Sequence, residues 1–462
     1  MTRQQRIFGT DGVRDKFGQG FLEPTKIARL LRATTAVLES RGDFPRDFSS
    51  HRSETAAFTV FVGRDTRVSG NDITELVAST FSAYGYTVLD VGVLPTPGVA
   101  YLAKQSPDCA IGVVISASHN PAEYNGIKFF APTGAKVSPD FEDAISRAYW
   151  EEAEGARRDG GASRADTGGV DAYIDYLVAS CRNPDVLKGR LVALDMAHGA
   201  THEVAPRVFQ ALGAEVVTMG DRPDGSNIND GCGALHPGRL ASEVVAQNAA
   251  YGFCFDGDGD RMIPVTEAGD VLDGDITLAI TGRHLQSEGR LPLNKVVATV
   301  MSNIGLEKSL AECKIELLRT PVGDRHVYES MVAEGHPVGG EQSGHLIFLD
   351  DALTGDGVLA AIRLVDSLAS FEWSLDKASR VMKRYPQILI NYDVARKLPL
   401  DDIPEVQEAI QRAEEDLAGE GRIVLRYSGT EPLLRVMVEG PESDLIETVA
   451  RQIGETVVQA TL

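Results

Sequence analysis

Hydrophobic and polar positions follow one pattern three times along the chain: a short apolar run, a loop with glycine, an amphipathic helix and a second apolar run. The first copy occupies residues 58–94. Its helix is predicted from apolar side chains spaced three or four residues apart, namely Ile73, Leu76, Val77, Phe81 and Tyr84. Gly85 follows, and glycine is typical of the residue just beyond a helix. The pattern predicts a strand, a helix and a strand.

The second and third copies occupy residues 190–220 and 295–324. Short strands that alternate with helices are typical of βαβ units, in which the strands run parallel. We therefore predict an α/β fold with three tandem α/β domains, each built on a mixed, mainly parallel sheet.

The C-terminal part has a different pattern. Two apolar runs flank a glycine-containing turn within residues 422–440, and a helix with one apolar face follows them. This predicts a smaller C-terminal α+β domain. The polar stretches 42–57 and 154–169 are predicted to be loops or linkers, the first of them a disordered insertion. The expected domain boundaries are 1–160, 161–263, 264–382 and 383–462.

Composition narrows the classes of function. The chain has 462 residues, 43% hydrophobic and 24% charged, as is typical of a folded protein. Its net charge of −22 argues against nucleic acid and against an anionic membrane as partners. No apolar run approaches the roughly 18 residues that span a bilayer, no secretion signal is visible, and the five cysteines form no CxxC pair. We expect a cytoplasmic protein whose anionic ligands are held by local clusters of cations.

The first segment with candidate catalytic residues is GVVISASHNPAEYNGIKFF, residues 112–130. Its apolar run ends in Ser118 and His119, and loops at the ends of parallel strands are where α/β folds bind ligands. A serine beside a histidine, with Lys128 ten residues on, suits a nucleophile flanked by proton-transfer groups. The alternative is a turn in which serine and asparagine only satisfy backbone groups.

The second segment, YGFCFDGDGDRMIPV, contains Asp256, Asp258 and Asp260 between two apolar runs. Three carboxylates this close repel one another unless a cation lies among them, and oxygen ligands suit Mg²⁺. Arg261 adds a fixed cation beside them, which suits a phosphate. Two alternatives are an acidic surface turn and a calcium-binding helix–loop–helix, although the latter requires glycine where Arg261 stands.

Two further segments are rich in polar groups between glycines. GGEQSGHLIFLDDALTGDG contains Glu341, Ser343 and His345, and its carboxylate and hydroxyl suit neighbouring sugar hydroxyls. RYSGTEPLLRV provides cations, hydroxyls and backbone N–H groups in one turn, a combination that suits a phosphate dianion. It lacks the ending of an ATP-binding loop, so nucleotide hydrolysis is not indicated. In both segments the alternative is an ordinary polar hairpin turn.

Taken in order, these segments resemble the α-D-phosphohexomutases, and within that family the branch that acts on glucosamine phosphates. The resemblance covers nearly the whole chain. It is carried by FGTDGVR at 8–14, GRDTRVSG at 63–70, SASHNP at 116–121, NGIKFF at 125–130, NINDGCG at 227–233, DGDGDR at 256–261, TPVGDRHVYESM at 320–331, GEQSGH at 340–345 and SGTEP at 428–432. The resemblance implies four domains around one central cleft, each contributing one loop.

The resemblance also implies roles for individual residues. Ser118 would be the phosphoserine, and its phosphate would hold Mg²⁺ together with Asp256, Asp258 and Asp260. Arg14, Lys128 and His345 would serve in proton transfer and charge stabilisation, and Glu341 and Ser343 would contact sugar hydroxyls. The non-reacting phosphate of the substrate would be held by Arg426, Ser428, Gly429, Thr430 and Arg435.

The activity that the resemblance implies is the interconversion of glucosamine 6-phosphate and glucosamine 1-phosphate through a 1,6-bisphosphate, upstream of UDP-N-acetylglucosamine and cell-wall precursors. Mutases of mannose and glucose phosphates are the nearest alternative. A non-catalytic phosphosugar-binding protein is another, although such a protein should have lost one of the reactive groups. The chain is expected to act as a monomer or a homodimer.

Overall fold

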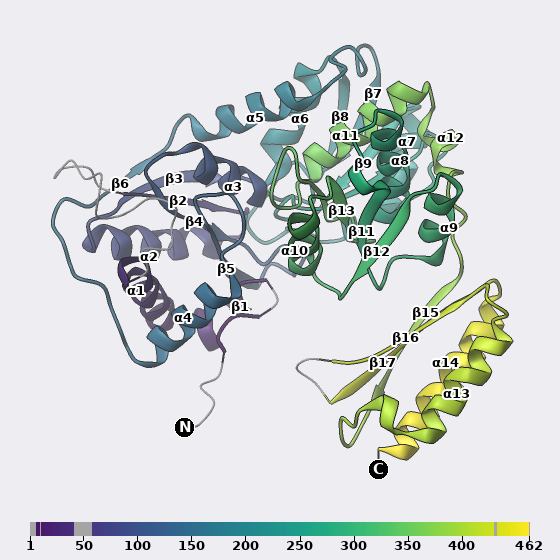
Figure 1. Ribbon diagram of the computed structural model, residues 1–462. Coiled ribbons are helices and arrows are strands. Elements are labelled where there is room, and N and C mark those ends of the chain that lie inside the picture. Colours follow the sequence, from purple (N-terminus) through teal and green to yellow (C-terminus); the bar gives the residue numbers. More distant parts are fainter. Residues whose placement is uncertain (1–5, 10, 41–57, 429–431, 462) are drawn as a thin grey trace.

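The computed structural model describes residues 6–9, 11–40, 58–428 and 432–461. The predicted insertion at 42–57 lies outside these residues. The first sheet has six strands in the order β1-β5-β4-β2-β3-β6, with β1 and β5 antiparallel to their neighbours and the other contacts parallel (Figure 1). Its elements are β1 (Val13–Lys16), β2 (Thr59–Arg64), β3 (Thr87–Val93), β4 (Cys109–Ile115), β5 (Tyr124–Phe130), β6 (Ala162–Ala165), α1 (Pro24–Ser40), α2 (Ser69–Ala83), α3 (Thr96–Gln105) and α4 (Pro139–Trp150). We call these elements the first unit.

The second unit has a four-stranded sheet in the order β10-β9-β7-β8, in which only β10 is antiparallel. Its elements are α5 (Gly169–Ser180), β7 (Leu191–Asp195), α6 (Thr201–Ala211), β8 (Glu215–Met219), α7 (Gly238–Gln247), β9 (Tyr251–Phe255) and β10 (Met262–Val265).

The third unit repeats this plan in the order β12-β11-β13-β14, in which only β14 is antiparallel. Its elements are α8 (Gly274–Ser287), β11 (Lys295–Thr299), α9 (Ile304–Glu312), β12 (Glu316–Thr320), α10 (Asp324–Glu334), β13 (Val338–Gly340), β14 (Leu346–Phe348), α11 (Gly357–Phe371) and α12 (Leu375–Ser379).

The C-terminal unit is an antiparallel sheet, β15-β17-β16, covered by two helices that lie along one of its faces (Figure 1). Its elements are β15 (Gln387–Asp393), α13 (Pro404–Asp416), β16 (Arg422–Tyr427), β17 (Leu433–Glu439) and α14 (Ser443–Ala460). The predicted fold class is therefore confirmed: three α/β sheets that are mainly parallel, followed by a smaller α+β unit.

All three predicted strand–helix–strand copies form, as β2-α2-β3, β7-α6-β8 and β11-α9-β12. In the first copy Gly85 follows the helix with φ +83°, a backbone conformation that glycine adopts without strain. One prediction was wrong: the stretch 154–169 contains β6, which pairs with β3 at the sheet edge. All four β6 residues are exposed, so no apolar pattern signalled this strand.

Apolar packing unites the first three units. One core cluster joins residues from all three sheets, including Phe61, Phe253 and Ala298, whereas the C-terminal unit has its own cluster around Val436 and Ile453. Among the described residues, none of the helices is both long and apolar enough to cross a membrane.

Candidate active site

The predicted nucleophile lies in the loop that follows β4. Ser118 is buried and has a φ of +53°, which is uncommon for a residue with a side chain. The buried Arg67 holds this conformation, because its Nη2 donates to the carbonyl oxygens of Ser118 at 2.9 Å and Asn120 at 2.8 Å. Asp65 in turn orients Arg67 through a 2.8 Å contact to Nε. The loop is thus more than a self-satisfied turn, since another segment holds its backbone in place.

The second unit also contacts this loop. Asn229 Nδ2 donates to the same two carbonyl oxygens, of Ser118 at 3.0 Å and of Asn120 at 3.1 Å. Gly257 lies so close that an added Cβ would come within 2.6 Å of the Ser118 carbonyl oxygen. A glycine is therefore needed at 257 for the aspartate turn to reach the serine loop.

The three predicted aspartates lie on the turn between β9 and β10. Asp256, Asp258 and Asp260 are buried, at 1%, 1% and 4% exposure, and each offers an oxygen within 4.8 Å of the others. Ser118 Oγ donates to Asp256 Oδ2 at 2.7 Å, so the serine and the triad form one site. Burial at 1% to 4% excludes the acidic surface turn, and the antiparallel β9–β10 pair excludes the calcium-binding helix–loop–helix.

The triad fits a divalent cation. Asp258 Oδ1 and Asp260 Oδ1 are buried without a hydrogen-bond partner among the described residues. Burial raises the pKa of Asp256 well above its usual range, and the neighbouring Asp260 and Asp258 raise it further. Buried carboxylate oxygens without partners are costly unless an ion or a proton satisfies them. An oxygen-coordinated metal would relieve both the desolvation and the repulsion.

Cations surround the triad on two sides. Lys128, on β5 and almost fully buried, places Nζ 2.8 Å from both Asp258 and Asp11. Burial alone would lower the pKa of Lys128, but Asp11 and Asp258 outweigh it and raise the pKa. Arg261 donates its backbone N–H to Asp256 Oδ1 at 3.1 Å. Arg14, on β1, forms a close ion pair with Asp11. The site can therefore stabilise the negative charge of a phosphoryl group.

Both predicted histidines lie at the site. His119 Nδ1 lies 3.3 Å from Ser118 Oγ, and burial, with Arg261 and Arg14 nearby, lowers the pKa of His119 to about 4. His345 is buried, with Nδ1 3.5 Å from Asp260 and Nε2 3.7 Å from Asp324. Burial would lower the pKa of His345, but Asp260 and Asp324 raise it.

The segment around Glu341 is a hairpin turn between β13 and β14 that reaches the aspartate turn. Gly344 accepts the backbone N–H of Met262 at 3.1 Å, and a Cβ at Gly344 would come within 2.4 Å of the Met262 carbonyl oxygen. Glu341 Oε1 accepts the Gly323 N–H at 3.2 Å, and Ser343 is exposed. The segment is thus a hairpin turn, and this is compatible with a role of Glu341 and Ser343 in binding sugar hydroxyls.

The predicted phosphate loop joins β16 to β17. Arg426 and Arg435 are directly opposite each other across these strands, and burial together with Arg435 lowers the pKa of Arg426. Ser428 is buried, and its carbonyl oxygen accepts from Lys397 Nζ at 2.5 Å. Gly429 and Thr430 lie outside the described residues. Two like charges directly opposite on a sheet are unfavourable unless an anion binds between them.

Sequence reasoning missed several side chains that complete the site. Thr96 Oγ1 donates to Asp258 Oδ2 at 2.7 Å, and Asp11, Lys136 and Asp324 form ion pairs beside Lys128 and His345. Two of these four residues, Asp11 and Asp324, lie inside motifs used for the resemblance, but Thr96 and Lys136 do not. Only their contacts in three dimensions identify them.

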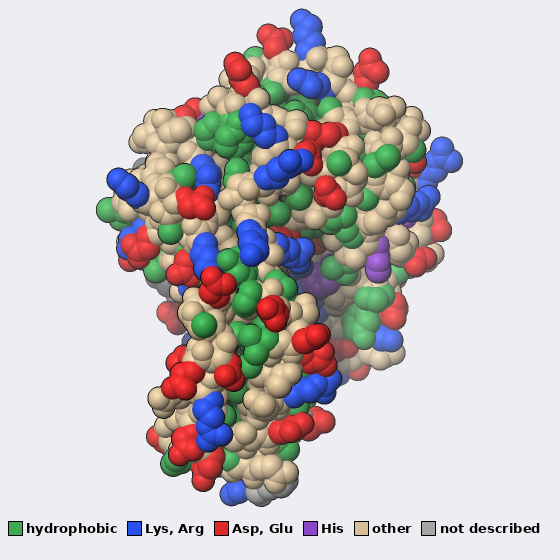
Figure 2. Space-filling model, turned by 90° about the vertical axis from the view of Figure 1, so that its right-hand side faces the viewer, with side chains coloured by type: hydrophobic (Ala, Val, Ile, Leu, Met, Phe, Trp, Pro, Cys, Tyr) green, Lys and Arg blue, Asp and Glu red, His purple; other side chains and the backbone are tan. Residues whose placement is uncertain are grey.

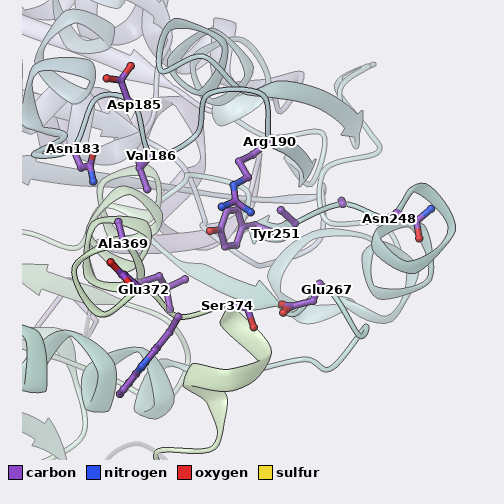
Figure 3. Close-up of a pocket in the computed structure, with 14 residues that line it drawn as sticks. Asn183, Asp185, Val186, Arg190, Asn248, Tyr251, Glu267, Ala369, Glu372 and Ser374 are labelled. Atoms are coloured by element: carbon purple, nitrogen blue, oxygen red, sulfur yellow. The ribbon is translucent and has the colours of Figure 1, made fainter.

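The surface is hollowed between the C-terminal unit and the other three units, and histidine and basic side chains are visible at the floor of the hollow (Figure 2). A separate cavity of about 720 Å³ lies between the second and third units and is lined by residues including Arg190, Tyr251 and Glu267 (Figure 3). It contains none of the residues predicted for the site.

Comparison with known proteins agrees with this arrangement. The family described as phosphoglucomutase/phosphomannomutase matches in all four of its domains: alpha/beta/alpha domain I over residues 5–156, domain II over 171–269, domain III over 273–385 and the C-terminal domain over 389–456. Among solved structures, a phosphoglucomutase/phosphomannomutase family protein from Burkholderia thailandensis has a TM-score of 0.79 at 22% identity, covering 100% of this chain and 98% of that chain. An Aspergillus fumigatus N-acetylphosphoglucosamine mutase, solved with GlcNAc-6P and magnesium, has a TM-score of 0.65 at 16% identity, covering 99% and 96%.

Nearer relatives in sequence carry one name. The phosphoglucosamine mutase of Hydrogenovibrio crunogenus is 41% identical over 458 residues, covering 99% of both chains. That of Desulforamulus reducens is 42% identical over 460 residues, covering 98% of this chain and 99% of the relative. With these matches over nearly its whole length and all four family domains in order, the chain belongs to the phosphoglucosamine mutases, within the phosphoglucomutase/phosphomannomutase family of α-D-phosphohexomutases.

Proposed function

We propose that the protein interconverts glucosamine 6-phosphate and glucosamine 1-phosphate by phosphoryl transfer through Ser118. The observation that carries the proposal is the 2.7 Å contact between Ser118 Oγ and Asp256 within a buried triad of carboxylates. A phosphorylated serine at this position would add its oxygens to those of the aspartates. Phosphoserine is needed because the 6- and 1-oxygens of one sugar are too far apart for direct transfer.

The aspartates and the phosphate on Ser118 would hold Mg²⁺, which neutralises charge on a transferring phosphoryl group. Arg261 and Lys128 carry fixed positive charge at the same place. Of the two predicted proton-transfer groups, His345 would remove the proton of the attacking sugar hydroxyl and later return it. Lys128, whose pKa is raised, would stay a cation that stabilises charge, with Arg14 and His119 beside the reacting groups. Closure of the site over the substrate would have to exclude water, which would otherwise hydrolyse the phosphoserine.

The product of the first transfer is a 1,6-bisphosphate, which must turn end for end before the second phosphoryl group returns to Ser118. The chain needs only one site for the non-reacting phosphate, because each orientation presents a phosphate at the same place. We assign that site to Arg426, Ser428, Gly429, Thr430 and Arg435, and the sugar hydroxyl contacts to Glu341 and Ser343. The opposed pair Arg426–Arg435 supports the phosphate assignment.

The reaction would take place in the cytoplasm, and its product would be used to make UDP-N-acetylglucosamine and cell-wall precursors. The name shared by the relatives at 41% and 42% identity supports the glucosamine branch. The domain matches also bear the names of phosphoglucomutase and phosphomannomutase, so these activities are the second candidate. A binding protein without activity is disfavoured, because the serine, the aspartates and the basic groups are all present.

The test is kcat/KM for the 6-phosphates of glucosamine, glucose and mannose at one Mg²⁺ concentration. Glucosamine 6-phosphate should give the highest value, with detectable turnover of glucose 6-phosphate. A site that must accept its ligand in two orientations pairs weakly with the 2-substituent, which gives selectivity of about tenfold rather than 10⁴-fold. A higher value for glucose or mannose would assign the chain to the second candidate.

A further inference from the structure

A continuous series of oppositely charged side chains connects two of the triad carboxylates. Each member contacts the next, and the residues come from three units of the fold. In order they are Asp258, Lys128, Asp11, Lys136, Asp324, His345 and Asp260. The two ends are proposed metal ligands, and two inner members are candidate catalytic side chains. The proposed function assigns no role to the three residues at the centre.

Lys136 is the central member. It follows β5 and forms close ion pairs with Asp11 and with Asp324, and the side chains are only 16%, 20% and 14% exposed, respectively. Burial would lower the pKa of Lys136, but the two carboxylates raise it, so Lys136 remains a cation at neutral pH. Without this cation, Asp11 and Asp324 would face each other as two partly buried negative charges, which repel.

The two carboxylates each support a different reactive group. Asp11 lies 2.8 Å from Lys128 Nζ, within the first unit. Asp324 begins α10 in the third unit, 3.7 Å from His345 Nε2. This nitrogen accepts the Gly355 N–H at 3.2 Å, and its contact with Asp324 is not a hydrogen bond. Lys136 therefore links Asp11, which contacts Lys128, to Asp324, which contacts His345.

We propose that Lys136 is a positioning residue for phosphoryl transfer: by fixing Asp11 and Asp324, it sets the distance between Lys128 of the first unit and His345 of the third. The inference rests on the proposed function for its consequence on turnover, and on the ion pairs alone for its geometry. Lys136 lies three contacts away from the aspartate triad, so it acts only through its neighbours.

A second ion pair between the first and third units offers a matched control. Arg325, next to Asp324, forms a bidentate ion pair with Glu142 of α4, at 2.7 Å and 2.9 Å. This pair joins the same two units and its arginine is 16% exposed, as Lys136 is, but it contacts neither Asp11 nor His345. Loss of Arg325 should therefore weaken the contact between the first and third units without moving Lys128 or His345.

The experiment compares Lys136→Met, Lys136→Arg and Arg325→Met with the wild-type protein. Displacement of reactive groups by about 1 Å can cost about 10²-fold in rate, so Lys136→Met should lower kcat by about that factor. Its KM should stay within about threefold of the wild-type value, because the phosphate and hydroxyl contacts are unchanged. Lys136→Arg should retain most of the activity, and Arg325→Met should lower the melting temperature with kcat nearly unchanged.

A second readout does not depend on turnover. The nine histidines are labelled with ¹⁵N, and the His345 imidazole signals are assigned by their loss in His345→Gln. These signals should shift in Lys136→Met and stay in place in Arg325→Met. Unmoved His345 signals in Lys136→Met, or an equal loss of kcat in both Met variants, would overturn the inference. If the wild-type protein converted no hexose phosphate, the proposed function would fail, and the His345 signals would still decide whether Lys136 positions that side chain.

Discussion

Among individual residues, two of the aspartates proposed as metal ligands have a buried oxygen without a hydrogen-bond partner among the described residues. Asp258 is 1% exposed and already accepts from Lys128 and Thr96, yet its Oδ1 has no partner among the described residues. Oδ1 of Asp260 likewise has no hydrogen-bond partner there, although Arg261 Nε lies 3.8 Å away. These two oxygens identify the side of the triad at which a cation would bind.

Substitution of Asp258 by asparagine should weaken metal binding. The variant loses one of three negative charges, so the Mg²⁺ concentration for half-maximal activity should rise by about tenfold or more. Chelation of divalent cations should abolish activity in the wild-type protein. Asp270→Asn, an exposed residue of the second unit, is the control and should leave the Mg²⁺ dependence unchanged. Activity that survives chelation would mean that the triad is structural.

Sequence reasoning identified residues whose chemistry is concentrated in short motifs. Ser118 and the aspartates could be found because each motif carries its own reactive groups. Arg67, Asn229 and Lys136 could not be found in this way. Each of them acts through a contact with a residue distant in the sequence, namely 51, 109 and 188 positions away, respectively. A buried cation in a sequence does not reveal which carbonyl or carboxylate it meets.

At the scale of elements, apolar periodicity predicted the strand–helix–strand copies because it is a local property. It failed for β6, whose side chains are all exposed and whose stability comes from backbone pairing with β3. It also did not reveal that Asp356 begins α11 as its cap while accepting a hydrogen bond from Tyr173 of α5, at 2.8 Å.

Asp356 should make stability depend on pH. Burial raises its pKa to about 6, although the Leu359 N–H and the Tyr173 hydroxyl oppose this. Because the folded state binds the proton more tightly than the unfolded state, stability falls as pH rises from about 4 to about 6. Asparagine has no proton to lose, so Asp356→Asn should gain stability over the wild-type protein between pH 4.5 and 7.5, by at most about 3 kcal/mol.

Thermal unfolding of both proteins at these two pH values measures the difference. The exposed Asp401→Asn should show no such pH-dependent gain. A constant difference between Asp356→Asn and the wild-type protein at both pH values would contradict the assignment of a destabilising charge to Asp356.

The β16–β17 strand pair should contribute mainly to substrate binding. Arg426→Ala or Arg435→Ala removes a charge that, in the proposed function, contacts the non-reacting phosphate in the ground state and the transition state alike. KM should rise by about tenfold or more, with a smaller change in kcat. Arg451→Ala, on the exposed face of α14, is the control. An unchanged KM in both strand variants would place the phosphate elsewhere.

At the scale of the whole molecule, the first three units share one apolar core and the C-terminal unit is attached to them mainly through polar contacts. Glu439 is fully buried at this attachment and accepts from Arg422 at 2.8 Å, from Gln387 at 2.9 Å and from the Ile304 N–H at 3.3 Å. Arg422 also donates to the Ser302 carbonyl oxygen. One buried carboxylate thus connects the C-terminal sheet to the third unit.

Glu439→Ala should loosen the C-terminal unit without unfolding the others. Loss of one partner of a largely buried ion pair costs roughly 3 kcal/mol of stability. Here it would weaken the attachment of the C-terminal unit to the third unit. Limited proteolysis should accelerate within residues 380–387, and KM should rise because the phosphate site is held less firmly. Glu420→Ala, at an exposed position of the same unit, should change neither. Wild-type proteolysis and KM in Glu439→Ala would show that other contacts hold the unit.

The central claim is that the phosphate which moves is the one on Ser118. Protein phosphorylated at Ser118 is mixed with one equivalent of glucosamine 6-phosphate and Mg²⁺, and intact mass and sugar phosphates are followed over a single turnover. The account predicts that the protein loses its phosphate to the 1-oxygen as glucosamine 1,6-bisphosphate appears. Glucosamine 1-phosphate then forms as Ser118 takes up the phosphate from the 6-oxygen, and Ser118→Ala does neither. Full mutase activity in Ser118→Ala, or turnover with no exchange of phosphate between Ser118 and the sugar, would contradict it.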